Sequence, residues 1–432
     1  MGLLYWGVIV IVGAGLAGLT CARVLHERRE PFMVLEASDG AGGRVRTTVT
    51  ASGFRLDRGF QVLFTAYPAV RRHLSLARLD LRRFDPGALI ALDGKLHTLA
   101  DPTRDLRALP ATALTDIISF EDKRQMIALR REVMRTPLRD LFVGDDTSTL
   151  EYLRARGFSE RFIDNVARPL YGGIFLDRAL LTSAAMFRFT FKMMAEGDVA
   201  VPAEGIGAIA EQLVRLLPLH NVRYNAPVDE VLTDGTRAYG VHTADGSVVE
   251  ADAVVVAADP PTTVHLTGIP LPTTPMSTTC IYFASLRSLY GGSKIVLNAA
   301  PDAFVNTLVQ ITNVAPRYAP PGQHLVAATV VGLPQGHDVD IAARAREDIR
   351  RMVPRCDLSA LEPLAVIRVP FAQYAQRTGF YHALPANETG IAGLIVAGDG
   401  TLSSSIQGAM LSGRRAAEAA LRAINMGSLS PV

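Results

Sequence analysis

The N-terminal part of the chain has the pattern of a strand, a helix and a second strand. Val8–Val12 is a run of β-branched residues that is apolar at every position, as in a central parallel strand buried on both faces. Phe32–Leu35 has the same character. A helix between the two strands is predicted by the spacing of Leu16, Leu19, Ala22 and Leu25. The pattern therefore predicts a β-α-β unit.

The C-terminal part repeats the change from strand to helix. Leu394–Ala397 predicts a short buried strand that runs into Gly398-Asp399-Gly400, and Ser403–Ser405 offer N-cap residues. A long final helix is predicted by the spacing of Ile406, Ala409, Met410, Gly413, Ala416, Ala417, Ala420 and Leu421.

Composition and charge exclude several classes of protein. The 432 residues are 49% apolar and 20% charged, which is typical of globular domains, and a net charge of +2 gives no excess for binding a nucleic-acid backbone. Three widely spaced cysteines indicate a reducing compartment, so we expect a cytoplasmic protein. Leu3–Ala22 is uncharged, but no Lys or Arg precedes it and three glycines interrupt it, which disfavours a signal peptide.

The turn between the first strand and the helix has the sequence Gly-x-Gly-x-x-Gly. Gly13 permits a tight turn, Gly15 lets the backbone approach a diphosphate, and Gly18 lets helix and strand pack closely. The helix N-terminus attracts the phosphates, and Glu36, directly after the second strand, can accept hydrogen bonds from a ribose diol. This order of elements predicts a dinucleotide site.

Two further motifs favour FAD over a nicotinamide coenzyme. Gly42-Gly43-Arg44 follows Glu36, and Gly398-Asp399-Gly400 follows the C-terminal strand. At these residues the chain resembles the FAD-dependent superfamily of amine oxidases, protoporphyrinogen oxidases and phytoene desaturases. The matching segments are GAGLAGL, LEASDGAGGRVRT, NAPVDEVLTDG and AGDGTLSSSIQGAMLSGRRAA.

The resemblance implies roles for individual residues. Glu36 would hold the adenosine ribose, Arg44 would lie along the phosphate and flavin side, and Val228 would contact the adenine. Asp399 would bind the ribityl or diphosphate part, and the helix beginning near Gln407 would stabilise the charge of a reduced flavin. The full expected coenzyme site is Gly13, Gly15, Leu16, Ala17, Gly18, Glu36, Ala37, Gly42, Gly43, Arg44, Gly59, Phe60, Val228, Gly398, Asp399, Gln407, Gly408 and Ala409.

The FAD is expected to be noncovalent. Cys356 is the last cysteine and lies 43 residues before Asp399, and only His382 stays as a remote candidate for a covalent link. The nine histidines are dispersed, with no HExxH motif, so no metal site is expected.

The resemblance implies an α/β fold with a Rossmann-like FAD-binding domain assembled from discontinuous segments, and an α+β substrate domain. We expect residues 1–75, 200–270 and 385–432 in the first domain, and 76–199 and 271–384 in the second. Residues 76–199 have a helical pattern, whereas 271–384 contain strand-like runs at Thr279–Ala284, Leu325–Val331 and Leu364–Val369.

The substrate class has a weaker signal. Amine oxidases of this superfamily place an aromatic residue shortly after the C-terminal glycine-acid motif, whereas Thr401–Ser405 contains none. Phe-Tyr-His-Ala-Leu-Pro (380–385) and Arg-Pro-Leu-Tyr-Gly-Gly-Ile-Phe (168–175) look more like the desaturase and protoporphyrinogen oxidase branch. The apolar stretch 179–191 fits either a tunnel or a buried helix core.

We therefore expect a flavin oxidoreductase that removes hydride from a large apolar small molecule at flavin N5, forming or rearranging C=C bonds. An amine oxidase that produces imine and hydrogen peroxide, and a redox-silent flavoprotein that binds a partner, stay open as alternatives. The flavin carries the redox chemistry, so no catalytic side chain is assigned. Cleft lining or plain core packing is expected of Tyr374, Phe380 and Tyr381. By the resemblance Lys294 would be the flavin-side lysine of the superfamily, but as one of four lysines it is rather expected at the surface.

Basic residues gather in two places, at 71–83 (Arg71, Arg72, Arg78, Arg82, Arg83) and from Lys123 to Arg139. Both clusters contain apolar residues and fit peripheral contact with an anionic membrane. Acidic residues interrupt the second cluster, which favours an ordinary solvated helix face. The sequence indicates neither the oligomeric state nor the electron acceptor.

Overall fold

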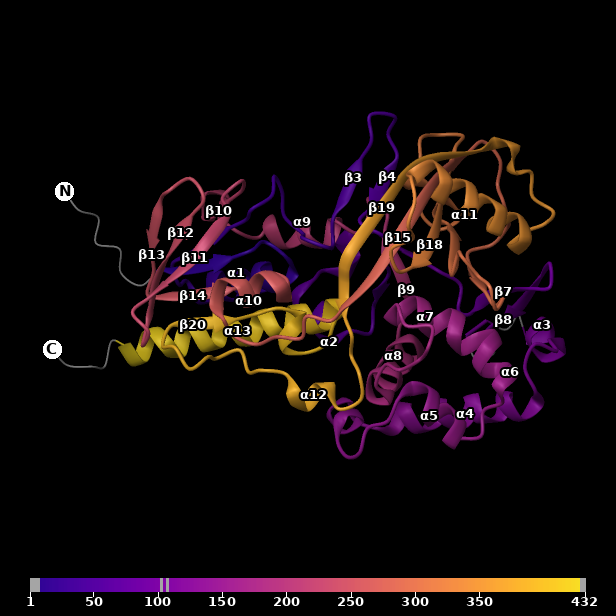
Figure 1. Ribbon diagram of the computed structural model, residues 1–432, viewed down its shortest axis with the longest axis horizontal. Coiled ribbons are helices and arrows are strands. Elements are labelled where there is room, and N and C mark those ends of the chain that lie inside the picture. The colour runs from indigo at the N-terminus through magenta and orange to yellow at the C-terminus, as the bar shows by residue number, and fades with distance from the viewer. Residues whose placement is uncertain (1–7, 102–103, 106–108, 428–432) are drawn as a thin grey trace.

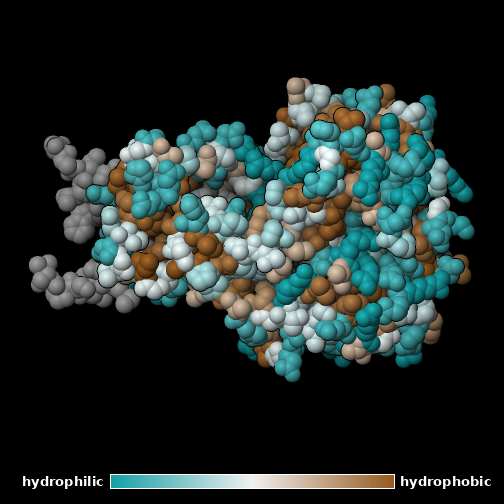
Figure 2. Space-filling model, viewed as in Figure 1, coloured by the Kyte–Doolittle hydropathy of each residue, from teal (hydrophilic) through white to brown (hydrophobic). Residues whose placement is uncertain are grey.

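The computed structural model describes residues 8–101, 104–105 and 109–427. Figure 1 shows an elongated molecule with a narrower lobe, in which the described part of the chain begins and ends, and a wider lobe of strands and helices. In Figure 2 the visible surface of both lobes is a mosaic of hydrophilic and hydrophobic residues. The uncharged segment Leu3–Ala22 lies partly outside the described residues, and from Ile9 onward it forms a strand and the start of a helix.

A five-stranded parallel sheet forms the centre of the narrower lobe. Its order is β10 (Val222–Arg223), β2 (Phe32–Leu35), β1 (Ile9–Val12), β14 (Ala253–Val256) and β20 (Leu394–Val396). The predicted strands at 8–12, 32–35 and 394–397 are therefore confirmed, and they lie in one sheet although they come from distant parts of the chain. This is the discontinuous Rossmann-like architecture that the sequence led us to expect.

The strands of this sheet are apolar throughout because both of their faces are covered. Ile9 and Ile11 belong to the core beneath the helices α1 (Leu16–Arg28) and α13 (Ile406–Gly427), whereas Val10 and Val12 pack with the antiparallel sheet. That sheet consists of β11 (Val228–Thr233), β12 (Ala238–Thr243) and β13 (Val248–Glu250). A side chain at Gly413 would place its Cβ 2.1 Å from the carbonyl oxygen of Ala17, so the two helices need glycine at their crossing.

A seven-stranded sheet forms the upper part of the wider lobe in Figure 1. The predicted strand runs are confirmed in β15 (Pro275–Ser285), β18 (His324–Val331) and β19 (Leu361–Tyr374), which pair antiparallel. The remaining strands are β17 (Thr307–Gln310), β16 (Ile295–Asn298), β7 (Ala88–Leu92) and β8 (Lys95–Leu99). The helix α11 (Asp338–Met352) packs on one face of this sheet.

Residues 76–199 are mainly helical, as their pattern indicates, in α3 (Leu109–Leu114), α4 (Phe120–Arg135), α5 (Thr149–Ala155), α6 (Glu160–Phe162), α7 (Arg168–Phe175) and α8 (Ala184–Glu196). They also supply β7 and β8, which the helical interpretation missed. Ile90 is the only β-branched residue in Ala88–Leu92, so the strand signal is weak, and parallel pairing with β16 decides the conformation.

The smaller elements connect these parts. They are β3 (Thr47–Val49), β4 (Arg55–Asp57), β5 (Leu63–Phe64), β6 (Leu81–Arg83), β9 (Val199–Pro202), α2 (Pro68–His73), α9 (Ala208–Val214), α10 (Pro260–Thr267) and α12 (Phe380–Ala383).

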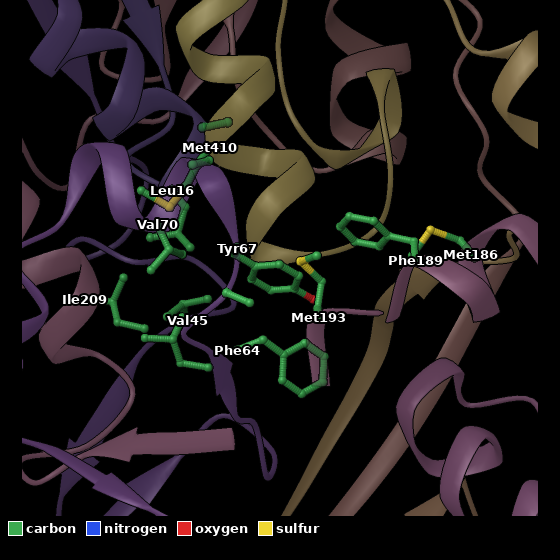
Figure 3. Packing of buried hydrophobic residues seen from close by; sticks show 14 of the residues in the cluster. Leu16, Val45, Phe64, Tyr67, Val70, Met186, Phe189, Met193, Ile209 and Met410 are labelled. Carbon is green, nitrogen blue, oxygen red and sulfur yellow. The ribbon is translucent and has the colours of Figure 1, made fainter. Parts of the chain in front are cut away.

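One hydrophobic core continues from the helices of the parallel sheet into the helical part of the wider lobe. Figure 3 shows Leu16 and Met410 at one end of this cluster and Phe189 and Met193 of α8 at the other, with Tyr67 between them. The rings of Tyr67 and Phe189 stack with their centroids 6.0 Å apart. The two lobes therefore share their core, and the domain boundaries given above stay a prediction.

Among the described residues, none of the helices has the length and apolar character that crossing a bilayer requires. All three cysteines are free, and Cys21 and Cys280 are buried, where loss of water raises the pKa of each thiol. The cytoplasmic location stays a prediction.

We expect His73 to make the fold sensitive to acid. The side chain is 3% exposed, and neither ring nitrogen has a hydrogen-bond partner among the described residues. Burial, together with the charges of Arg23 and Arg72, lowers the His73 pKa to about 4. The folded state therefore binds fewer protons than the unfolded state below the ordinary histidine pKa, and stability falls as the pH drops through that range.

In His73→Leu this acid sensitivity should disappear. Urea unfolding at about pH 8 and at about pH 5 measures the effect. Between these two pH values the free energy of unfolding of the wild type should fall by about 2 kcal/mol more than that of the variant. An equal loss in both proteins would show that His73 is protonated without cost in the folded state.

Candidate functional site

A single cavity of about 1,210 Å³ connects the two lobes. It begins where β1, β2, β14 and β20 end, at Gly13, Glu36, Ala257 and Gly398, and it continues between the seven-stranded sheet and the helices α4, α7 and α8. The carboxyl edge of a parallel sheet is the usual binding edge of this architecture. The volume exceeds the range of ordinary drug-sized pockets, so it has room for a coenzyme and a second molecule.

The glycine turn has the geometry that its sequence predicts. Gly13 has φ +103°, where a Cβ would lie 2.8 Å from the carbonyl oxygen of Ala257. A Cβ on Gly18 would lie 1.9 Å from the Gly13 oxygen, whereas one on Gly15 would meet no atom within 4 Å. Gly13 and Gly18 are therefore required by the fold, and Gly15 borders open space in the cavity.

The first turn of α1 faces this space with Gly15, Leu16 and Ala17. No side chain caps the helix, and its first turn contains no acidic residue. Its N–H groups and the positive end of its dipole are therefore available to an anionic group. Gly18 lies behind the turn and does not line the cavity.

Glu36 is held rigidly at the end of β2. One oxygen, Oε2, accepts a hydrogen bond from the Ala14 N–H at 2.7 Å, and Oε1 accepts from the N–H and the hydroxyl of Ser38 at 2.9 and 2.6 Å. The side chain is 9% exposed and lines the cavity together with Ala37 and Val228. A fixed carboxylate at this place can accept hydrogen bonds from a diol.

The two terminal motifs meet in an ion pair. Arg44 Nη2 lies 2.7 Å from Asp399 Oδ1, and Nη1 lies 2.9 Å from Oδ2, so the contact is bidentate. Arg44 also donates to the Ala372 carbonyl of β19, and Ser404 donates to Asp399 at 2.6 Å. Burial raises the pKa of Asp399, but the charge of Arg44 and these hydrogen bonds outweigh burial and keep the pKa below its ordinary value.

Most of the other expected coenzyme residues lie on the cavity wall, namely Gly42, Gly43, Gly59, Phe60, Gly398 and Ala409. Gln407 and Gly408 do not. The Gln407 side chain accepts a hydrogen bond from the Ala69 N–H at 2.8 Å, and the Gly408 N–H donates to Ser405 Oγ at 2.9 Å. Ser405 thus caps α13, as its sequence predicts. At this end of α13 the cavity wall is formed by Ser404, Ser405 and Ile406 instead of Gln407.

Sequence reasoning missed four polar wall residues at this end, namely Arg58, Gln61, Asp259 and Thr262. Gln61 Nε2 donates to the Arg44 carbonyl at 2.8 Å, and Asp259 caps α10 by accepting from the Thr262 N–H at 2.9 Å. Asp259 ends the apolar run 253–258 that contains β14, which was the available signal.

The aromatic residues near the C-terminus do not line the cavity, so the cleft interpretation of them is wrong. The Tyr374 hydroxyl donates to the Leu402 carbonyl at 2.9 Å, and Tyr381 packs against Phe142 at a centroid distance of 4.7 Å. Phe380 packs between Tyr374 and Tyr381. Only the preceding part of β19, through Gln373, reaches the cavity.

Lys294 is also placed differently from expectation. It is 9% exposed, and its Nζ lies 2.6 Å from an Asp105 oxygen. The lysine is therefore a buried ion-pair partner rather than a surface group, and it does not reach the cavity wall.

The cavity wall in the wider lobe is apolar and aromatic. On α8, Met186, Phe187, Thr190, Phe191 and Met194 face the cavity, so the apolar stretch 179–191 contributes to a wall. Further apolar wall residues are Phe60, Phe84, Ile90, Leu129, Phe158, Phe162, Tyr171, Phe175, Ile295 and Ile367.

Five carboxylates belong to the described cavity wall. Glu36, Asp259 and Asp399 lie at the sheet edge, whereas Asp85 and Asp101 follow β6 and β8 in the wider lobe. The wall residues that α7 and α8 contribute include no acidic side chain. No group of His, Cys, Asp and Glu in the described part of the chain has the arrangement of a metal site.

The parallel sheet, its glycine turn and the elongated cavity define a Rossmann-like α/β protein with a second sheet-and-helix lobe. The model of the flavin-containing amine oxidoreductases matches residues 16–421, and the chain belongs to this family. It is therefore an oxidoreductase, and the family implies a flavin cofactor.

Two relatives agree with this assignment, and a solved structure has the same fold. The chain is 30% identical over 285 residues to a zeta-carotene-forming phytoene desaturase from Myxococcus xanthus, a match that covers 59% of this chain and 53% of the relative. It is 24% identical over 465 residues to a 15-cis-phytoene desaturase from Synechococcus elongatus, covering 95% of each. An oxidoreductase from Methanosarcina mazei has the same fold, with a TM-score of 0.75, 18% identity and coverage of 95% of this chain and 100% of that one.

The Arg44–Asp399 pair should be needed for stability. Asp399→Asn leaves the Arg44 charge partly buried without its partner, so we expect the free energy of unfolding to fall by about 3 kcal/mol. Urea unfolding would measure the loss. As a matched control, Glu388→Gln removes an exposed ion pair with Arg422 and should change the free energy by less than about 1 kcal/mol. Equal effects of the two substitutions would contradict the role given to Asp399.

Proposed function

We propose that the flavin is FAD, held noncovalently along the cavity from the sheet edge to the Arg44–Asp399 pair. The fit rests on the open space beside Gly15, the uncapped N-terminus of α1 and the fixed carboxylate of Glu36. In this proposal α1 holds the diphosphate, Glu36 the adenosine ribose and Val228 the adenine. Asp399, Ser404 and the start of α13 lie towards the flavin.

The noncovalent character is supported by the places of the groups that could form a link. Cys21, Cys280 and Cys356 all lie off the cavity wall, and so does His382, which borders a small separate pocket beside Tyr381.

We further propose that the substrate is a large apolar molecule that is desaturated in the wider-lobe part of the cavity. The observation that carries this proposal is the apolar and aromatic wall that α7 and α8 form, which stabilises hydrocarbon and itself offers no carboxylate as a counter-charge to an ammonium group. FAD, when bound, supplies an acceptor for a hydride taken from the substrate.

The side chains of the cavity wall would position the substrate and would not themselves take part in the redox step. The rings of α7 and α8 would hold an extended substrate by its faces, and the close aromatic lining would exclude water from the reacting carbon atoms. The relatives named above, both phytoene desaturases, support the same class of substrate. Because a molecule of this kind partitions into membranes, we also propose that the protein takes it up at a membrane surface.

Gly15→Ala tests the coenzyme site separately from the fold. Since an added Cβ has no neighbour within 4 Å, the variant should keep the wild-type melting temperature. It should bind FAD about tenfold or more weakly, because the methyl group occupies the space of the diphosphate. Titration of deflavinated protein with FAD, followed by flavin fluorescence, measures this change. Gly291→Ala also adds a Cβ in open space, but away from the cavity, and should bind FAD normally.

The substrate proposal predicts a yellow protein whose flavin colour bleaches anaerobically with phytoene, zeta-carotene or a porphyrinogen. Phe191→Asn should lower kcat/KM for the reacting compound by about tenfold, because it removes apolar wall surface while leaving the coenzyme residues intact. Val339→Asn, at a site that is 78% exposed on α11, is the matched control and should react normally.

Two outcomes would contradict the substrate proposal. Bleaching by primary or secondary amines, with peroxide release in air, would identify an amine oxidase. Absence of bleaching with every compound of the panel would identify a flavoprotein without redox function.

A further inference from the structure

One helix of the wider lobe exposes apolar and basic residues in a single row. On α4, the positions Phe120, Arg124, Ile127, Arg131, Met134 and Arg135 follow one another at helical spacing, and we call them the α4 stripe. The stripe exposes 77% of Phe120, 48% of Ile127 and 37% of Met134. A solvated helix face would have polar side chains at these three positions.

The acidic residues of α4 do not neutralise the stripe evenly. Asp122 is buried and accepts hydrogen bonds from Ser119 and Ser159, and Glu132 accepts from Arg156, the residue after α5, at 2.6 Å. Glu121 pairs with Arg124 at 2.8 Å. Arg131 and Arg135 have no ion-pair partner within the described ranges, so the C-terminal half of the stripe keeps its positive charge.

The stripe lies beside the cavity. Met126, Ile127, Arg130 and Arg131 of α4 are part of the cavity wall, although Ile127 is half exposed. An apolar molecule that leaves a surface in contact with the stripe would therefore meet the apolar cavity directly. Figure 1 shows α4 at the margin of the wider lobe, away from the parallel sheet of the narrower lobe.

The other basic cluster lacks these features. Arg82 pairs with Asp80 at 2.8 Å, Arg83 pairs with Asp198 at 2.8 Å, and Arg71 donates to the Thr65 carbonyl. None of its arginines lines the cavity. The structure thus separates two clusters that the sequence treats alike.

We propose that the α4 stripe docks on a bilayer that contains anionic phospholipid. Phe120, Ile127 and Met134 enter the interface between headgroups and acyl chains, while Arg131 and Arg135 contact the headgroup phosphates. The docked protein holds its cavity against the bilayer, where an apolar substrate is dissolved. Only this last step rests on the proposed function, because docking itself requires neither flavin nor turnover.

Vesicle flotation of the purified full chain tests the stripe. The protein should float with vesicles of phosphatidylcholine and phosphatidylglycerol, bind vesicles of phosphatidylcholine alone more weakly, and dissociate as salt is added. Arg131→Ser with Arg135→Ser should lower the partition coefficient about 25-fold, at about fivefold for each arginine. Phe120→Ser with Ile127→Ser should lower it about tenfold or more on either vesicle.

Matched controls use exposed residues on other faces. Leu219→Ser with Val339→Ser removes apolar residues that are 84% and 78% exposed, and Arg28→Ser with Arg72→Ser removes two exposed arginines. Neither pair should change vesicle binding. Equal losses in stripe and control variants would overturn the proposal, as would absence of binding to anionic vesicles.

The two proposals fail separately. A protein that bleaches with phytoene in detergent but does not bind vesicles would overturn the docking surface and leave the substrate class supported. A protein that binds vesicles through the stripe but bleaches with no apolar compound would support the docking surface and overturn the substrate class.

Discussion

The structure depends on one ion pair, between the buried Asp399 and the partly buried Arg44, that joins the two ends of the chain. Arg44 and Asp399 are 355 positions apart, yet they meet in a bidentate contact beside the cavity. Two charges withdrawn from water must be paired, so the N-terminal glycine loop and the turn after β20 have to come together. The third hydrogen bond of Arg44, to Ala372 of β19, extends this constraint into the wider lobe.

Around this pair the cavity changes its chemistry. On the side of the parallel sheet it offers a helix N-terminus, backbone N–H groups and the fixed carboxylate of Glu36, which suit a charged and polar coenzyme. On the other side it offers aromatic rings from α7 and α8. One cavity can have both kinds of wall because the two lobes share one hydrophobic core. Tyr67, for example, packs against Phe189 of α8 and also lines the cavity.

The parts of the site that could be predicted were those whose signal is local. Gly13, Glu36 and the strands beside them follow from residue type and short spacing, because a tight turn and a doubly buried strand restrict the sequence directly. The wall of the wider lobe could not be predicted in the same way. Tyr374 and Phe380 have the composition of a cleft wall, but whether an aromatic ring faces a cavity or a core depends on the packing of distant segments.

The sequence by itself determined the strands of the parallel sheet, the glycine turn and the family, because hydrophobic period, glycine sterics and short motifs act over a few residues. Tertiary structure alone decided that Ala88–Leu92 is a strand, that Gln407 turns towards α2 and that Lys294 is buried. It also decided which basic cluster borders the cavity. Each of these outcomes depends on a partner that lies far away in the chain, and the free energy of such a contact exists only once the chain has folded.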